Sequence, residues 1–242
     1  MTSRLSSAFI LTAILFSGAL LRLVLLGNDS LWYDELYTVW ASKLPLDSLI
    51  EEVAASGHPP LYYLLMHGWL TLGAGELWIR LISWMVGVAT IGFTFLVGKE
   101  LFDHRVGLWA SALVAVSPLL IWYSMDSTYY SWLIFLVLLS LFLLVRSAKR
   151  GGLWNWLGYT LATSLLLLTH FFSVVIIAAE IVVFFLLWER SKDRFVSWVV
   201  SQGFLVIILT VPTLLLTNST GNMVNTSIPA IKTCLNSSPF AA

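Results

Sequence analysis

Two adjacent carboxylates, Asp34 and Glu35, are the residues of this chain best suited to chemistry. They lie between Asn28 and Tyr63, the longest polar interval of a mostly apolar sequence, which holds six of the thirteen acidic residues. A carboxylate can act as a general base on an acceptor hydroxyl, and it can bind a divalent cation together with a phosphate-bearing substrate. The alternative interpretation is a pair of solvated acids in a loop.

His58 is held by the two prolines that follow it, Pro59 and Pro60. A residue before proline favours an extended backbone, and proline fixes its own φ angle, so the histidine ring has a defined direction. Such a ring could bind a metal or a phosphate, or transfer a proton. The alternative is that the prolines only form a stiff entry to the next helix.

Three more polar residues are expected at the ends of apolar segments. Arg80 could bind a lipid phosphate, or extend its charge to the membrane interface. Asp126 occupies a short turn, where a carboxylate close to the bilayer is costly unless it faces a polar cavity. His170 divides two apolar segments. The alternatives for Asp126 and His170 are turn-forming residues without a binding role.

The composition indicates an all-α integral membrane protein. The chain has 242 residues, of which 59% are hydrophobic and 11% charged, whereas soluble domains have about 25% charged residues. A soluble domain of this size could not bury so many helices that are apolar all round. The net charge of zero indicates no surface for nucleic acid. The single Cys234 excludes an internal disulfide and a metal site built from cysteines.

About seven apolar segments have the length of a membrane span, which takes about 20 residues. The first is interpreted as a retained helix, because its apolar run is long and no signal-peptidase site follows it. Arg22 near its end could reach the interface or face protein. Leu61–Gly73 is too short to span. The seven segments are 8–26, 78–98, 106–124, 129–145, 153–170, 173–188 and 195–216.

The basic residues predict the topology. Short loops with Lys99 and Arg105, with Arg146 to Arg150, and with Arg190 to Arg194 should be cytoplasmic, as should the N-terminus with Arg4. One crossing must then separate the outer loop, 27–77, from Lys99, so Leu61–Gly73 is expected to lie along the outer interface or to re-enter the membrane without spanning it.

The organisation expected around that loop is simple. Pro45–Ala55 is predicted as an amphipathic helix on the bilayer, with Asp47, Glu51 and Glu52 solvated. Residues 1–216 are expected to form one membrane domain, followed by a polar, poorly ordered tail at 217–242.

Several motifs, in order, resemble the polytopic GT-C glycosyltransferases, in particular the branch that is similar to dolichyl-phosphate-mannose protein mannosyltransferases and includes the lipid A aminoarabinose transferases. The resemblance covers about residues 8–216. The motifs are WYDE, GHPPLYYLLMHGWL, ELWIRLISWMVGVATI, GKELFDHRVGLWASALVAVSPLLIWYS and a Thr-His-aromatic hairpin.

The resemblance implies transfer of a sugar, with inversion, from a polyprenyl-phosphate-linked donor to a lipid, glycan or protein acceptor at the outer face of the cell membrane. Asp34 matches the catalytic carboxylate and Glu35 is its neighbour. A divalent cation, Mg²⁺ or Mn²⁺, is expected on Asp34 if one is used. The expected substrate-binding residues are His58, Pro59, Arg80, Asp126, Tyr130 and His170.

Two departures from the family pattern leave an alternative open. Thr128 stands where the family often has an arginine, and family members often continue for further spans. The chain could therefore be a truncated or non-catalytic lipid-binding subunit. A transporter is disfavoured, because transporters place ionisable residues near the bilayer midplane and these lie at one edge.

Overall fold

The computed structural model describes residues 2–27, 30–187, 192–205 and 207, and every regular element in these ranges is helical. The predicted all-α class is therefore confirmed for this part of the chain. Residues Met1–Ser201 form one compact unit and Gln202–Ala242 a second. The architecture below concerns the first unit. The tail predicted at 217–242 lies outside the described residues.

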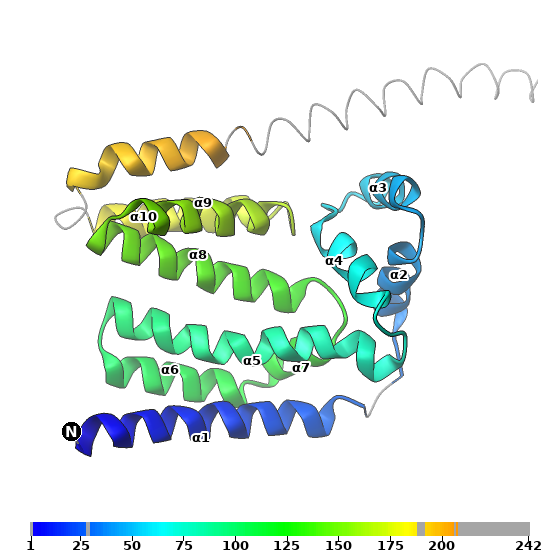
Figure 1. Ribbon diagram of the computed structural model, residues 1–242, viewed down its shortest axis with the longest axis horizontal. Coiled ribbons are helices and arrows are strands. Elements are labelled where there is room, and N and C mark those ends of the chain that lie inside the picture. The colour runs from blue at the N-terminus through cyan, green and yellow to red at the C-terminus, as the bar shows by residue number, and fades with distance from the viewer. Residues whose placement is uncertain (1, 28–29, 188–191, 206, 208–242) are drawn as a thin grey trace, which may run out of the picture. The chain divides into compact units, whose positions relative to one another are not determined.

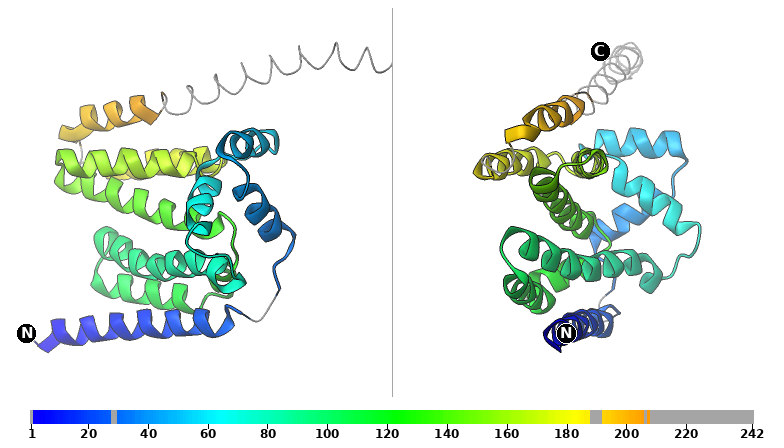
Figure 2. Two further views of the ribbon diagram at one scale, coloured as in Figure 1. Left: turned by 45° about the vertical axis from the view of Figure 1, so that its right-hand side comes forward. Right: turned by 60° about the vertical axis from the view of Figure 1, so that its left-hand side comes forward.

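Long helices lie side by side, and three short helices gather at one end of them (Figures 1 and 2). The elements of the chain, in order, are α1 (Thr2–Leu25), α2 (Tyr33–Ser42), α3 (Leu46–Ala55), α4 (Leu61–Leu70), α5 (Glu76–Leu101), α6 (His104–Val116), α7 (Pro118–Met125), α8 (Tyr130–Arg150), α9 (Leu153–Leu167), α10 (Ser173–Leu186) and the 3-10 turn η1 (Lys192–Arg194). A further short apolar helix is Phe195–Leu205.

Three of the described helices, within α1, α5 and α8, are long and apolar enough to cross a membrane. The pair α6 and α7, bent by 61° at a short break, makes a fourth if it counts as one span. The predicted number of about seven spans is not confirmed, since α10 and Phe195–Leu205 are apolar but shorter. Helix α4 has ten residues, so it is too short to span, as predicted.

The break between α6 and α7 is caused by Pro118, which lacks a backbone N–H and cannot continue α6. Arg22 of α1 donates hydrogen bonds to backbone carbonyl groups at the C-terminal end of α6. Its guanidinium donates to the carbonyl oxygens of Ala115 at 2.8 Å and Val114 at 3.0 Å, and to the hydroxyl of Ser124 in α7 at 3.0 Å. Arg22 is completely buried, so it faces protein and does not reach the interface.

Helix α7 is held against α5 by a close approach at Gly87. A Cβ atom added at Gly87 would lie 2.1 Å from the Ser124 hydroxyl oxygen, so no larger residue fits there without a shift. Arg22 and Gly87 together place α7, which ends at Met125 and is followed directly by Asp126. The turn that carries Asp126 is therefore positioned from two sides.

A second polar contact lies between α8, α9 and α10. The buried carboxylate of Glu180 accepts hydrogen bonds from Ser140 at 2.5 Å and from Tyr159 at 3.1 Å. A carboxyl group in an apolar bundle is costly unless it is hydrogen-bonded, so this set joins the three helices. No pattern in the sequence analysis singled out Glu180.

The predicted amphipathic helix Pro45–Ala55 is confirmed as α3, but its apolar stripe is divided. Leu49 and Val53 are fully buried against Ala41 and Tyr63, while Leu46 is about half exposed. Half of the stripe therefore packs α3 onto α2 and α4. The other half, Leu46 and Ile50, is exposed in this structure.

Candidate functional site

An ion pair between Glu35 and Arg80 ties α2 to the start of α5. The Nε and Nη2 atoms of Arg80 donate to the two carboxylate oxygens of Glu35 at 2.7 and 2.6 Å. Glu35 is fully buried, and Arg80 also donates to the backbone carbonyls of Leu26 and Ser30. A buried charge is stable only when it is paired and hydrogen-bonded, and this pair meets both conditions.

The Glu35 carboxylate also receives two backbone N–H groups. Glu35 occupies the third position of α2, and its Oε2 accepts from the backbone nitrogen of Trp32 at 3.3 Å, which stabilises the start of the helix. Its Oε1 accepts from the backbone nitrogen of Ser127 at 3.0 Å. With Arg80 included, both carboxylate oxygens are fully used by protein donors.

Asp126 lies beside this pair, in the turn between α7 and α8. Its carboxylate accepts hydrogen bonds from the indole nitrogen of Trp32 at 3.0 Å and from the hydroxyl of Thr128 at 2.9 Å. Burial raises the pKa of Asp126, the hydrogen bonds from Trp32 and Thr128 oppose that rise, and the charges of Glu35 and Asp34 add to it. Asp126 therefore lies in a turn, as expected, and its carboxylate is hydrogen-bonded by protein groups.

A cavity of about 370 Å³, here called the Asp34 cavity, opens on the other side of the start of α2. Within the part of the chain that the structure describes, the half-buried carboxylate of Asp34 has no hydrogen bond or ion pair. It is therefore free to accept a proton or hydrogen bond from a ligand. The lining residues are Tyr33, Asp34, Tyr37, Thr38, Glu52, Ser56, His58, Tyr63, Thr128, Tyr129 and Tyr130.

His58 reaches this cavity because of the turn that ends α3. Gly57 has a φ angle of 77°, which a residue with a side chain rarely adopts, and the backbone nitrogen of His58 binds the carbonyl of Val53. The Nδ1 atom of His58 lies 3.2 Å from the hydroxyl oxygen of Ser56. The centroid of the His58 ring lies 5.8 Å from that of the Tyr129 ring. The rigid backbone predicted for His58 therefore directs its ring toward the tyrosines that line the cavity.

His170 does not line the Asp34 cavity, but it packs against Tyr129, which does. Its ring centroid lies 5.0 Å from that of Tyr129. Burial lowers the pKa of His170, and the nearby His58 lowers it further. Burial also raises the pKa of Tyr63 and Tyr129, so both phenols are neutral hydrogen-bonding groups at physiological pH.

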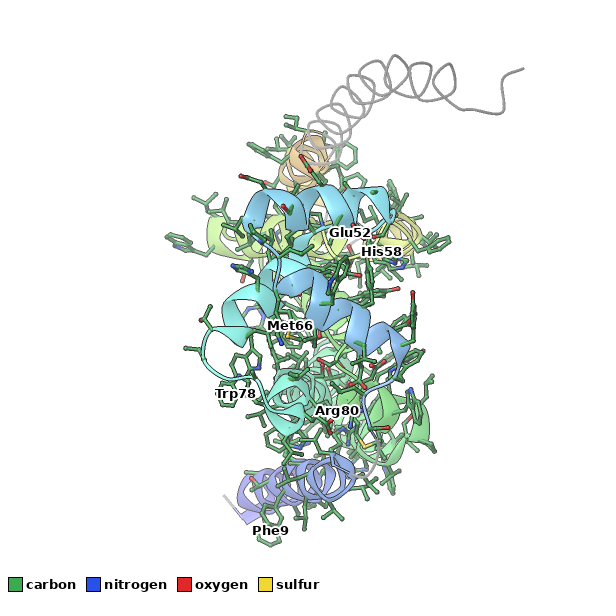
Figure 3. All side chains as sticks on the ribbon, turned by 90° about the vertical axis from the view of Figure 1, so that its right-hand side faces the viewer. Phe9, Glu52, His58, Met66, Trp78 and Arg80 are labelled. Carbon is green, nitrogen blue, oxygen red and sulfur yellow. The ribbon has the colours of Figure 1, made fainter. Side chains whose placement is uncertain are left out.

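A second cavity of about 230 Å³, here called the Arg80 cavity, lies on the Glu35 side of α2. Its walls come mainly from apolar residues at the ends of α1 and α7. Figure 3 shows Glu52 and His58 of the Asp34 cavity near one another and Arg80 apart from both. The lining residues are Leu25, Leu26, Ser30, Trp32, Glu35, Arg80, Trp122, Met125 and Asp126.

The structure thus divides the predicted site residues between two neighbouring cavities. Asp34, His58 and Tyr130 line the first, while Glu35, Arg80 and Asp126 line the second. Pro59 is buried before α4, and His170 lines neither cavity.

Most residues that line the Asp34 cavity were not predicted as site residues, among them Glu52, Tyr37, Tyr63 and Tyr129. Glu52 was expected to be solvated, but its carboxylate accepts a hydrogen bond from Tyr37 at 3.3 Å. The spacing of Tyr33 and Tyr37, four residues apart on one helix face, was a signal for a shared aromatic wall. Nothing in the sequence linked Glu52 to that wall.

Few side chains of the described residues lie close enough together to bind a divalent cation. The described residues contain no group of three or more His, Cys, Asp or Glu side chains that could hold a metal ion. Asp34 and Glu52 line the same cavity, but they do not form a metal site of that size. The residues present therefore do not make a complete cation site by themselves.

Residues 57–216 match the family model of the dolichyl-phosphate-mannose-protein mannosyltransferases. No curated protein and no solved structure matches the chain. The match covers well over half of the 242 residues and includes His58, Arg80, Asp126 and His170, whereas Asp34 and Glu35 precede it. The resemblance inferred from the motifs is thereby confirmed, and the chain belongs to the dolichyl-phosphate-mannose-protein mannosyltransferase family.

Proposed function

We propose that this membrane glycosyltransferase moves a sugar from a polyprenyl-phosphate-linked donor to a hydroxyl of a lipid, glycan or protein acceptor. Family membership supports a membrane glycosyltransferase in general and a donor of this kind. The observation that carries the proposal is the Asp34 carboxylate, which has no partner among the described residues and faces a cavity of about 370 Å³. A free carboxylate in a polar cavity suits a general base.

In the proposed reaction, Asp34 accepts the proton of the acceptor hydroxyl. The hydroxyl oxygen forms a bond to the anomeric carbon of the donor sugar, and the bond from that carbon to the phosphate oxygen breaks. The lipid phosphate leaves with the electron pair, and the proton remains on Asp34. A single displacement of this kind inverts the anomeric configuration.

Glu35 takes a positioning role in this proposal. Both of its oxygens accept hydrogen bonds from Arg80 and from backbone N–H groups, so its carboxylate is not available as a base. The pair fixes the start of α2, and Asp34 is the residue directly before Glu35. We therefore assign proton transfer to Asp34 alone.

The phosphate of the donor is assigned to the Arg80 side. Arg80 borders that cavity and carries a positive charge, although it shares its donors with Glu35. His58 and Tyr130 border the Asp34 cavity, where their hydrogen-bonding groups suit the hydroxyls of the sugar or the acceptor. His170 and Pro59 lie behind the residues that line this cavity. His170 packs against Tyr129, and Pro59 lies just before the start of α4.

A divalent cation, Mg²⁺ or Mn²⁺, would have Asp34 as its ligand and would supply positive charge that favours a phosphate-bearing substrate. The remaining ligands would have to come from the substrates or from water, because the described residues do not gather three suitable side chains. No step above depends on the cation. Transfer in the presence of EDTA, with and without added Mg²⁺ or Mn²⁺, tests its use.

The reaction is assigned to the outer face of the cell membrane. The short helices α2, α3 and α4 and both cavities lie at one end of the long helices, and the basic residues Lys99, Lys149 and Arg150 lie at the ends of α5 and α8 that lead away from it (Figure 1). Basic loop residues favour the cytoplasmic side. This distribution supports a cytoplasmic N-terminus and an outer-face site.

The test is transfer of radiolabelled sugar from polyprenyl-phosphate donors in membranes, with mannose, glucose and aminoarabinose donors compared. Replacing Asp34→Asn should reduce transfer by at least about 100-fold, the usual contribution of a general base. Asp47→Asn is the matched control, because Asp47 lies in α3 and lines neither cavity.

The possible results separate the alternatives. Transfer that survives Asp34→Asn would move the base elsewhere, with Asp126 as the next candidate. No transfer from any of the three donors by the unmodified chain would support a non-catalytic, lipid-binding subunit instead of an enzyme.

A further inference from the structure

Adjacent residues at the start of α2 and in the turn after α7 line different cavities, so these two segments lie between them. Trp32 and Glu35, three residues apart, line the Arg80 cavity, while Tyr33 and Asp34 between them line the Asp34 cavity. Residues three apart on a helix share a face, so this alternation follows from the start of α2. The first turn of α2 therefore has one cavity on each side.

Three side chains of these two segments are here called the partition: Trp32, Asp126 and Thr128. Asp126 lines the Arg80 cavity, Thr128 lines the Asp34 cavity, and the Thr128 hydroxyl donates to the Asp126 carboxylate at 2.9 Å. The Trp32 indole donates to the same carboxylate at 3.0 Å. Asp126 and Thr128 are 5% and 2% exposed, so the partition is closed to solvent at this point.

The two cavities differ in charge. Among the described lining residues, Arg80 is the one lysine or arginine, and it borders the second cavity. Each cavity is lined by two carboxylates, Asp34 and Glu52 in the first and Glu35 and Asp126 in the second, but in the second the charge of Arg80 offsets that of Glu35. The phosphate end of a lipid donor therefore belongs on the Arg80 side, and a neutral acceptor on the Asp34 side.

The general base must nevertheless reach the anomeric carbon of that donor. Asp34 and the donor phosphate lie on opposite sides of the partition in this arrangement, so the reaction needs a passage between the two cavities. A passage that stayed open would also admit water from the Asp34 cavity. Water has a hydroxyl that Asp34 could deprotonate as readily as that of an acceptor.

We propose that the partition of Trp32, Asp126 and Thr128 keeps the donor's sugar–phosphate bond away from water until an acceptor fills the Asp34 cavity. Trp32 and Thr128 are positioning residues, which act by holding the Asp126 side chain across the passage. This role rests on the proposed function. It predicts a particular failure when the partition is weakened.

That failure is hydrolysis of the donor. A water oxygen forms a bond to the anomeric carbon, the bond to the phosphate oxygen breaks, and the lipid phosphate leaves with the electron pair. One proton of the water passes to Asp34, and the product is free sugar. A residue with a purely structural role, or one that aids catalysis, would not increase this reaction when it is replaced.

The experiment measures free sugar released from radiolabelled polyprenyl-phosphate mannose by the full chain, without acceptor. Trp32→Phe removes the indole N–H and keeps an aromatic ring, and Thr128→Val removes the hydroxyl and keeps the shape. Each should raise the release of free sugar about fivefold, the change expected when one hydrogen bond of about 1 kcal/mol is lost. A saturating acceptor should suppress this extra release of free sugar, since a filled cavity excludes water.

Matched controls isolate the partition. Trp40→Phe makes the same change on the same helix, at an exposed tryptophan that lines neither cavity. Thr71→Val removes a hydroxyl that binds only the backbone of Gly68. Neither should alter the release of free sugar. Asp34→Asn added to Trp32→Phe should abolish the extra hydrolysis, because the water would lose its base.

The outcomes are distinct. Normal transfer by the unmodified chain, with no rise of free sugar in Trp32→Phe or Thr128→Val, would overturn the partition and leave the proposed function intact. A fall in both transfer and hydrolysis, in variants that unfold at the normal temperature, would show that these residues assist catalysis and would also overturn it. Absence of transfer by the unmodified chain would overturn the proposed function itself.

Discussion

Asp34 and Glu35 are neighbours in the chain but face different cavities. Asp34 lines the larger cavity without a protein partner among the described residues, while Glu35 is fully buried and bound by Arg80 at 2.6 Å. The same chemical group is thus free at one position and fully engaged at the next. This contrast supports the assignment of Asp34 to chemistry and Glu35 to structure.

Glu35→Gln should destabilise the fold strongly while leaving the polypeptide able to insert into membranes. Breaking a buried ion pair from one side costs about 3–5 kcal/mol, because the other charge stays buried without its partner. The expected result is a clearly lower unfolding temperature of the protein in detergent. Glu35→Met combined with Arg80→Met should recover part of that loss, since the double change leaves no unpaired charge.

The ion pair of Glu100 and Arg150, whose side chains are 13% and 56% exposed, is the control for this experiment. Their charged atoms are 2.8 Å apart, but the Arg150 side chain is 56% exposed. Solvent weakens such pairs to about 0–1 kcal/mol, so Glu100→Gln should hardly change the unfolding temperature. Equal effects of Glu35→Gln and Glu100→Gln would contradict the structural role assigned to Glu35.

Arg22→Met should destabilise the break between α6 and α7. The change keeps an apolar side chain of similar length but removes the donor to the carbonyl of Ala115, and it also removes the Arg22 hydrogen bonds to the carbonyl of Val114 and the hydroxyl of Ser124. An unsatisfied buried polar group costs about 1–3 kcal/mol, and thermal unfolding in detergent measures the sum.

Arg105→Met serves as the comparison for Arg22, because Arg105 is exposed near the start of α6. This variant should unfold at nearly the same temperature as the unmodified chain. If Arg22→Met behaved in the same way, the contacts of Arg22 would contribute little to the placement of α7.

Stability should fall in mild acid through His170. Burial, together with the nearby His58, lowers the pKa of His170 below its ordinary value of 6.5. Between that lowered pKa and about pH 6.5, the unfolded chain binds a proton that the folded chain does not, so stability decreases as the pH falls through this window. Unfolding temperatures measured from pH 7.5 to pH 5 should show the decrease.

His170→Asn should make this part of the pH profile flatter, since asparagine does not titrate. An unchanged slope in His170→Asn would assign the acid sensitivity to another group. The comparison uses the difference between two profiles, so a uniform loss of stability in the variant does not affect its interpretation.

The proposed outer-face site predicts which residues a membrane-impermeant maleimide can reach. In a Cys234→Ser background, Tyr33→Cys should be labelled in intact cells, because Tyr33 is 78% exposed beside the Asp34 cavity. Phe102→Cys, in the turn after α5 and 72% exposed, should be labelled only after the membrane is opened. The reverse pattern would place the site in the cytoplasm.

The sequence alone determined the class of this protein and much of its candidate chemistry. Apolar length, low charge and ordered motifs were sufficient for an all-helical membrane protein of this family, because these properties are local or follow the order of the chain. The choice of Asp34, His58, Arg80 and Asp126 as candidates also came from local signals. These were a carboxylate beside aromatic residues, a histidine before prolines, and charges at the ends of apolar segments.

Helix lengths were less accessible to sequence. Hydropathy indicated a continuous segment at 106–124, but Pro118 divides it into α6 and α7, with a bend of 61°. The segment 153–170 was taken as one span, whereas α9 ends at Leu167. An average over apolar residues does not register where backbone hydrogen bonds stop, so it does not give the ends of individual helices.

Only the tertiary structure decided which candidate faces which. Arg80 binds Glu35 across 45 positions, Ser127 binds it across 92, and Glu52 joins the site through Tyr37. Helical periodicity can place Asp34 and Glu35 on different faces, but it does not say what lies opposite each face. That depends on how α2 packs between the start of α5 and the turn after α7, which brings distant residues within hydrogen-bonding distance.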